Sequence, residues 1–297
     1  MSPTAVTPQL LRAHPLPQHD QQGDKQARGR VLVIAGSVEM PGAALLAGLG
    51  ALRAGAGILQ IATCRPAACH LAIAMPEAMV VGCRETPAGG LDPAEAPRLT
   101  ELGSGCDAVL IGPGMTDEAA VAELTSALLK RLEAAAFVLD ASAFATLKSG
   151  EMPARHAGRI VVTPHSGEMA KFLDLSRKEV DSGPLRAARQ AAAALQAVVA
   201  MKGASTYVVS PSGEAWLCEN GSIGLATSGS GDTLAGIVAG LLARGTPPAL
   251  ATIWAVYMHG EAGRRLAKRN GTFGLLAREI PGEIPRIMQE LSDASSS

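Results

Sequence analysis

The stretch ATSGSGDTLAG, Ala226 to Gly236, combines small residues with one acid where a helix is expected to begin. Gly229 and Gly231 can adopt backbone angles that turn successive N–H groups to one side, an arrangement that binds anions. The positive end of the following helix adds to this attraction. The stretch therefore indicates a site for a phosphate whose charge is redistributed during transfer.

Asp232 directly follows this turn. A carboxylate repels phosphate, so phosphate binding does not explain its position, whereas a base facing an attacking hydroxyl group would. The alternative is an aspartate that caps its helix beside glycines of a tight turn. The stretch alone is compatible with both. The chain has no GxxxxGK[ST] loop, no GxGxxG after its first predicted strand and no GxSxG, which argues against the site classes that those patterns mark.

Short apolar runs that end in small or polar residues predict six buried strands: Val31–Ser37, Ile58–Thr63, Ala108–Gly114, Phe137–Ser142, Arg159–His165 and Ala197–Gly203. Segments with helical spacing lie between them, over Pro41–Ala54, Glu118–Ala134 and Leu185–Gln196. This alternation predicts an α/β protein with a mostly parallel central sheet flanked by helices.

Ligands of such sheets bind beyond the carboxyl ends of the strands. The predicted strands end in groups more polar and flexible than packing requires: Gly36–Ser37, Gly112–Gly114, Asp140, Thr163–His165 and Lys202–Gly203. We expect them to outline one crevice.

Composition limits the kinds of partner. The 297 residues are 47% hydrophobic but only 3% aromatic, which predicts an aliphatic core, and a net charge of -1 gives no field that would attract nucleic acid or an anionic membrane. Five scattered cysteines without a CxxC pair favour free thiols in a reducing compartment. No apolar run is long enough to span a bilayer. We expect a cytoplasmic protein.

The expected organisation is an N-terminal extension over residues 1–30, one catalytic domain over residues 31–292 and a flexible tail over residues 293–297. Within the domain, Thr206–Gly221 predicts a hairpin around Pro211–Gly213. Thr246–Pro248 should end one helix and start the next.

The segment TSGSGDTLAGIVAGLLARG, Thr227 to Gly245, resembles the anion hole and catalytic aspartate of the ribokinase-like superfamily. Four further motifs narrow the resemblance to the ADP/ATP-dependent NAD(P)H-hydrate dehydratases: VLVIAGSVEMPGAALLAGLGALRAGAG, AVLIGPG, VVTPHSGEMAKFL and VVAMKGASTYVVSPSG. Together they span Val31 to Gly245. The resemblance implies a three-layer ribokinase-like fold. It also implies a repair enzyme that phosphorylates the hydroxyl of the S epimer of hydrated NADH or NADPH with ADP or ATP, then eliminates phosphate.

The resemblance also implies roles for individual residues. Asp232 would be the base that deprotonates the hydroxyl, and the amides of Gly229, Ser230 and Gly231 would hold the moving phosphoryl group. The hydrated dinucleotide would contact Ala43, Gly114, His165 and Asp232. The phosphoryl donor would contact Lys202, Gly203, Ala204, Ser205, Thr206 and Gly231, and Glu168 would approach Mg²⁺ through water.

Structural interpretations stand beside these roles. His165 could cap the next helix, Glu168 could be a first-turn acid stabilised by the helix dipole, and the segment Lys202–Thr206 could be a turn. Ala43 could mark a helix start and Gly114 a glycine loop. His259 lies in an apolar helical pattern that favours packing, and the basic cluster at residues 264–269 favours a solvated helix end.

The sequence departs from the family pattern at three positions. Ser230 stands where threonine is common and keeps a small hydroxyl group, whereas Ser142 replaces a carboxylate and Ser166 replaces a frequent proline. The family further implies an NAD(P)H-hydrate epimerase as functional partner and a homotetramer. The residues decide neither between ADP and ATP nor between hydrated NADH and hydrated NADPH.

Two other functions compete with the dehydratase. A vitamin-precursor kinase of the same superfamily would share Asp232 and the glycine turn but stop at the phosphorylated product. A nucleotide-sensing module would keep the fold without turnover, although retention of Asp232 and the whole turn argues against it.

Overall fold

A ten-stranded sheet forms the centre of the computed structural model, which describes residues 2–18, 25–133, 135–145, 147 and 153–293. Its strands are ordered β1-β10-β9-β8-β7-β6-β5-β2-β3-β4. They comprise β1 Thr4–Ala5, β2 Arg30–Ile34, β3 Ile58–Cys64, β4 Ala78–Cys83, β5 Ala108–Ile111, β6 Ala136–Leu139, β7 Ile160–Val162, β8 Val198–Met201, β9 Thr206–Val209 and β10 Ala215–Cys218.

The sheet is parallel except where β9 pairs with β8 and with β10. All six predicted strands form, and the predicted hairpin is β9–β10. The sequence prediction missed β4, an edge strand whose Met79 is exposed and whose residues do not form one buried run. It also missed β1, which is two residues long and pairs with β10.

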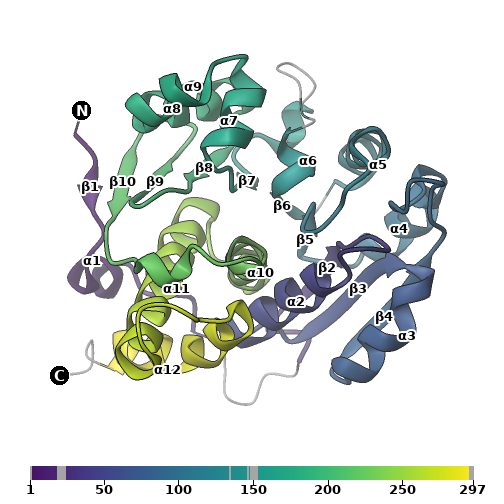
Figure 1. The fold of residues 1–297 in the computed structure, drawn as a ribbon, viewed down its shortest axis with the longest axis horizontal. Coiled ribbons are helices and arrows are strands. Elements are labelled where there is room, and N and C mark those ends of the chain that lie inside the picture. The colour runs from purple at the N-terminus through teal and green to yellow at the C-terminus, as the bar shows by residue number, and fades with distance from the viewer. Residues whose placement is uncertain (1, 19–24, 134, 146, 148–152, 294–297) are drawn as a thin grey trace.

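Helices cover both faces of the sheet (Figure 1). They comprise α1 Pro8–Ala13, α2 Gly42–Arg53, α3 Arg65–Ala74, α4 Ala96–Gly103, α5 Glu118–Arg131, α6 Ala141–Ala145, α7 Ser166–Leu173, α8 Arg177–Ser182, α9 Pro184–Leu195, α10 Ser230–Ala243, α11 Pro248–Asn270 and α12 Ile280–Asp293. Short 3₁₀ turns occupy Pro93–Glu95, Ala154–His156, Ile223–Leu225 and Ala277–Glu279. Two aliphatic cores result, one under α2, α10, α11 and α12 and the other under α4, α5, α7 and α9. The predicted three-layer α/β fold is confirmed.

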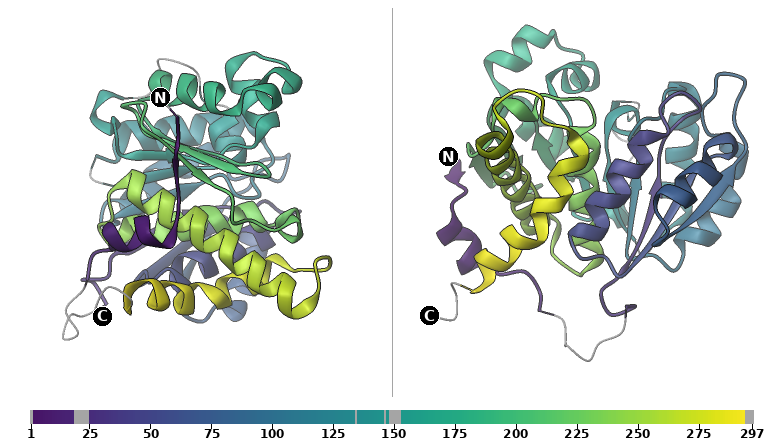
Figure 2. Two further views of the ribbon diagram at one scale, coloured as in Figure 1. Left: turned by 90° about the vertical axis from the view of Figure 1, so that its left-hand side faces the viewer. Right: turned by 60° about the horizontal axis from the view of Figure 1, so that its bottom comes forward.

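The described part of the N-terminal segment packs onto this domain. Strand β1 runs beside β10, Leu11 of α1 is fully buried, and α1 contacts α12 (Figure 2). Residues 2–18 of the expected extension therefore share the core of the domain. At the other end α12 reaches Asp293, and positions 294–297 of the expected tail lie outside the described residues. Across the described ranges, no helix combines the length and apolarity that crossing a membrane requires.

Helices α2 and α10 lie in unusually close contact. A Cβ atom on Gly236 or Gly240 of α10 would come closer than 3.0 Å to the carbonyl oxygen of Ala47 or Ala51 in α2, and one on Gly50 would lie 2.5 Å from the carbonyl oxygen of Thr233. Only glycine permits such an approach. The contact fixes the N-terminal ends of both helices at the carboxyl edge of the sheet.

Gly236→Ala should therefore destabilise the fold. The added methyl group meets backbone rather than a movable side chain, so we expect the free energy of unfolding in urea to fall by about 2–3 kcal/mol. Gly282→Ala, at an exposed position of α12, is the matched control, because nothing lies within 4 Å of the Cβ position of Gly282. Alanine there should leave stability unchanged or raise it by up to about 1 kcal/mol. Equal effects of the two substitutions would contradict the close helix contact.

Candidate active site

The polar ends of the parallel strands meet at one edge of the sheet, as predicted. The Gly36 amide after β2 donates to the carbonyl oxygen of Pro113 after β5 at 2.7 Å. The Lys202 amide after β8 donates to the carbonyl oxygen of Pro164 after β7 at 2.8 Å. Neighbouring strand ends are therefore joined through their backbones. Of the groups expected to outline one crevice, only His165, Lys202 and Gly203, after β7 and β8, line the cavity described below.

A buried ion pair lies in the middle of this edge. Asp140 follows β6, and its side chain is 3% exposed. Its Oδ1 accepts hydrogen bonds from the Thr163 hydroxyl at 2.6 Å and from Lys202 Nζ at 2.9 Å. Because the charge of Asp140 is buried, these bonds hold Lys202 in place.

The glycine turn leads into α10 with a left-handed residue at Gly229, as the sequence predicts, whereas Gly231 is already part of the helix and has no positive φ. Gly229 is the N-cap residue with φ +85°, and no side chain caps the helix. A Cβ atom on Gly229 would overlap Leu46 of α2, so the turn rests directly on that helix. Asp232 is the third residue of the helix and lies in its first turn. Since Gly229 holds the N-cap position, Asp232 is not the cap.

The carboxyl group of Asp232 holds its proton more tightly than an ordinary aspartate does. The pKa of its carboxyl group is raised to about 6, chiefly by burial; the negative charges of Asp140 and Glu168 contribute to the rise, and the positive charge of Lys202 opposes it. A carboxylate near neutral pKa is a stronger proton acceptor than an ordinary aspartate. These properties suit a general base.

Lys202 supplies positive charge beside the turn. Its Nζ lies 3.2 Å from the position that a Cβ atom on Gly231 would occupy. Burial lowers the pKa of Lys202, but Asp140, Glu168 and Asp232 outweigh that effect, and the net pKa lies above its ordinary value. The ammonium group therefore remains charged next to the helix amides, where an anion would bind.

His165 and Glu168 form the capping box of α7. His165 Nδ1 accepts from the amides of Gly167 and Glu168, and Glu168 Oε2 accepts from the His165 amide at 2.8 Å. The structural interpretation of both residues is thus realised. The side chain of His165 is nevertheless 58% exposed, and a backbone β-bridge holds the residue beside Lys202, so a ligand can still reach the imidazole.

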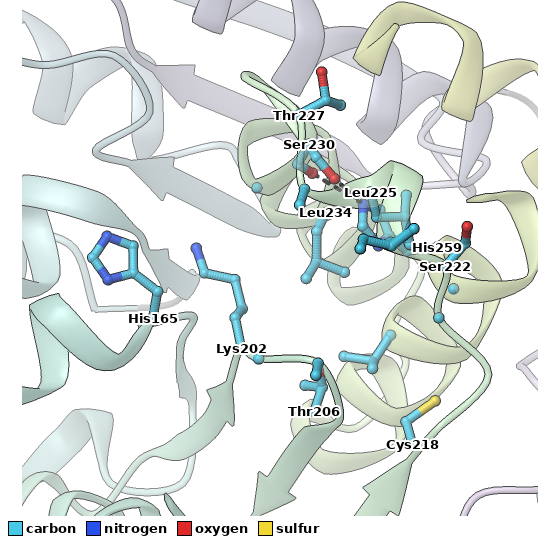
Figure 3. A pocket seen from close by; sticks show the side chains of 18 of the residues that line it. His165, Lys202, Thr206, Cys218, Ser222, Leu225, Thr227, Ser230, Leu234 and His259 are labelled. Atoms are coloured by element: carbon cyan, nitrogen blue, oxygen red, sulfur yellow. Dashed lines mark hydrogen bonds between the residues drawn. The ribbon is translucent and has the colours of Figure 1, made fainter. Parts of the chain in front are cut away.

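A cavity of about 720 Å³ opens beside these groups. Figure 3 shows His165 and Lys202 on one wall and Ser230 and His259 on another. Of the predicted site residues, it is lined by His165, Lys202, Gly203, Ala204, Thr206, Ser230 and Gly231. Ser205, Glu168 and Asp232 are not among its lining residues.

Ala43 and Gly114 lie outside that cavity but against each other. A Cβ atom on Gly114, whose φ is +65°, would lie 2.5 Å from Cβ of Ala43. The same Cβ atom would lie 2.8 Å from the Met40 carbonyl oxygen and 3.4 Å from Cα of Gly36. These two predicted substrate contacts thus share one place between the ends of β2 and β5.

Sequence reasoning missed the position of His259. Its side chain is buried and contacts Ser230 of the glycine turn, and it lines the cavity. A lone histidine in an apolar helical pattern gives no sign of a partner 29 residues earlier. At the departures from the family pattern, the Ser142 hydroxyl donates to the Met115 carbonyl oxygen at 2.9 Å, and Ser166 begins α7.

The sheet order, the glycine turn at α10 and the adjacent acid define a ribokinase-like protein. A ribokinase-like superfamily protein from Enterococcus faecalis superposes with a TM-score of 0.83 at 27% identity, over 97% of this chain and 96% of that one. The chain belongs to the NAD(P)H-hydrate dehydratase family, whose model matches residues 31–286.

Two relatives match over almost their whole lengths. The ADP-dependent (S)-NAD(P)H-hydrate dehydratase of Xanthomonas campestris is 45% identical over 96% of both chains. The ADP/ATP-dependent NAD(P)H-hydrate dehydratase of Bacillus subtilis, co-crystallised with ATP/Mg²⁺, has a TM-score of 0.86 and 32% identity, over 98% of this chain and 99% of that one.

Asp232→Asn should stabilise the protein in a pH-dependent way. The pKa rises from 3.8 to about 6 on folding, so stability falls as the pH rises through that interval. We expect the variant to gain about 1–3 kcal/mol in unfolding free energy near pH 8 and little at or below about pH 4. Exposed Asp174, replaced by Asn, is the control. A pH-independent effect at Asp232 would contradict the raised pKa.

Proposed function

We propose that this chain is an ADP/ATP-dependent (S)-NAD(P)H-hydrate dehydratase, a lyase that restores NADH or NADPH from the hydrated forms. The observation that carries the proposal is Asp232, a carboxyl group with a pKa of about 6 in the first turn of α10, next to the glycine turn and Lys202. Membership of the family supports it.

In this proposal Asp232 takes the proton from the hydroxyl group of the hydrated nicotinamide ring. The hydroxyl oxygen bonds to the terminal phosphorus of the nucleotide, and the bond from that phosphorus to the leaving diphosphate or monophosphate breaks. The amides of Gly229, Ser230 and Gly231, with the ammonium group of Lys202, balance the charge of the moving phosphoryl group. The carbon–oxygen bond then breaks, phosphate leaves with the electron pair, and loss of a ring proton restores the double bond.

The two substrates would occupy different parts of the edge. The cavity that Lys202, Gly203, Ala204, Thr206 and Gly231 help to line is large enough for an adenine nucleotide. The hydrated dinucleotide would lie toward Ala43 and Gly114, which pack against each other beside the ends of β2 and β5. Ser205 would contact the nucleotide because it lies in the same turn as Gly203 and Ala204. His165 would lie between the nucleotide and the hydrated dinucleotide.

Magnesium fits this donor set as an ion held mainly by phosphate and water. Among the described residues, no cluster of three or more histidine, cysteine or acidic side chains has metal-binding spacing. Mg²⁺ usually keeps several waters and takes few protein ligands. Glu168, whose side chain is 15% exposed, would hold the ion through water. The ion would neutralise phosphate charge in this site.

The remaining expectations belong to the same proposal. An enzyme selective for the S epimer leaves the R epimer untouched, so an NAD(P)H-hydrate epimerase is its natural partner. The described cysteines are unpaired thiols, which suits the cytoplasm. A homotetramer is the assembly that the family resemblance implies.

The direct test incubates the purified protein with Mg²⁺, hydrated NADH or hydrated NADPH, and ADP or ATP. We expect recovery of reduced-nicotinamide absorbance with one inorganic phosphate released per turnover. Asp232→Asn should lower kcat by about 10²–10⁴-fold. A phosphorylated product without phosphate release would indicate a kinase. Turnover of the variant near the parent rate would contradict the role of Asp232.

Asp140→Asn tests the electrostatics of the base. Asparagine can keep contacts with Thr163 and Lys202 but removes a negative charge that raises the pKa of Asp232, while Glu168 and Lys202 remain. The acid limb of kcat should therefore move to lower pH by about one unit. Asp174→Asn should leave the limb in place. A shift to higher pH would contradict the assigned coupling.

A further inference from the structure

Ser230, at the first position of α10, lies against a histidine from a different helix. His259 on α11 places Nε2 3.0 Å from Ser230 Oγ and 3.0 Å from the Ser230 carbonyl oxygen (Figure 3). Both residues are buried: Ser230 is 5% exposed and His259 is 9% exposed. Both also line the cavity. The imidazole therefore contacts the part of the turn that faces a bound nucleotide.

The segment after β10 contacts α11 on both sides of His259. The Asn220 side-chain amide, just after β10, donates to the carbonyl oxygen of Tyr257 at 2.9 Å. A Cβ atom on Gly260 would lie 2.5 Å from Asn220 Oδ1, so glycine at that position permits the contact. Asn220 thus holds α11 on both sides of His259, in residues 257 and 260.

The protonation state of His259 follows from these partners. The pKa of the imidazole is lowered to about 4, chiefly by burial; the positive charge of Lys202 also lowers it, and the hydrogen bond to Ser230 opposes the change. The ring is therefore neutral at pH 7 and carries one N–H. Because a carbonyl oxygen only accepts hydrogen bonds, the proton belongs on Nε2.

This tautomer determines what the Ser230 hydroxyl group can do. The Nε2–H donates to the carbonyl oxygen and is shared with Ser230 Oγ, which accepts. The hydroxyl proton of Ser230 is then free to point into the cavity. The hydroxyl becomes a donor for a phosphoryl oxygen, in addition to the backbone amides of the turn.

We infer that His259 is a positioning residue, which orients the Ser230 hydroxyl so that it donates to the phosphoryl group during transfer. The inference rests on the proposed function, because it names a further donor in that site. The sequence prediction treats His259 as packing, and the burial of neighbouring Trp254 and Met258 agrees with a packing contribution. The two roles are separable, because packing needs volume and orientation needs a donor.

Three single variants separate them. His259→Met keeps an apolar side chain of similar size without a donor, and kcat should fall by about 10- to 100-fold. His259→Gln keeps a side-chain donor and should retain activity within about threefold of the parent. His156→Met is the matched control, since buried His156 donates its Nε2–H to the Leu129 carbonyl oxygen at 2.7 Å on another part of the fold. It should lower the melting temperature without lowering kcat.

A double-mutant cycle identifies Ser230 as the mediator. Ser230→Ala should lower kcat by about 100-fold. Adding His259→Met should then cost less than threefold more, because the hydroxyl that His259 orients is already gone. Additive losses, or equal losses in kcat for His259→Met and His156→Met, would overturn the inference.

The same cycle is run on the binding of ATP with Mg²⁺, measured by calorimetry without a second substrate. We expect coupling between positions 230 and 259 of at least about threefold in Kd. If that coupling persists while the parent protein fails to restore NADH, the proposed function fails and the inference stands. If neither binding nor turnover couples the two positions, the inference fails independently of the proposed function.

Discussion

The close contact between α2 and α10 is the constraint on which the site depends. Carbonyl oxygens of one helix occupy space that side chains would fill on the other, at Gly50, Gly236 and Gly240. Helices that touch through their backbones have little freedom to slide or rotate. This one helix contact therefore fixes the start of α10, the glycine turn that rests on Leu46, and the end of α2 that carries Ala43.

Burial and the charged residues around Lys202 then determine the proton affinity of Asp232 in this site. Asp140, Glu168 and Asp232 are three acids around a single ammonium group, that of Lys202, and each of them raises its pKa. Asp140 and Glu168 also raise the pKa of Asp232. Asp140 is tied to Lys202 and Thr163, whereas Glu168 caps α7. Burial, together with the negative charges of Asp140 and Glu168, raises the pKa of Asp232 to about 6. The ionised Asp232 lowers the stability of the fold near neutral pH, but its raised pKa is what a general base requires. Many active sites combine lower stability with such a shifted pKa.

Local sequence patterns predict most of the central sheet and the edge at which the site lies. The six central strands are continuous apolar runs ending in polar groups, so both their existence and the edge at which Asp140 and Lys202 meet could be predicted. Strand β4 could not be, because an edge strand with exposed Met79 lacks a buried run. The N-terminal β1 gains its structure only from pairing with β10.

The site shows the same division between local and distant signals. The turn before Asp232 was predictable from residue types alone, while the contact between Ser230 and His259 joins residues 29 positions apart on different helices. The pKa of Asp232 likewise depends on charges from three other segments of the chain. Such properties arise from tertiary packing, which no local pattern encodes.

The most direct test of the account is a crystal structure of the Asp232→Asn protein with hydrated NADH and ATP bound together. The account predicts the ring hydroxyl within about 2.6–3.2 Å of the residue 232 side chain, with the terminal phosphate at the amides of residues 229–231. A hydroxyl group directed elsewhere, or a terminal phosphate away from that turn, would contradict it.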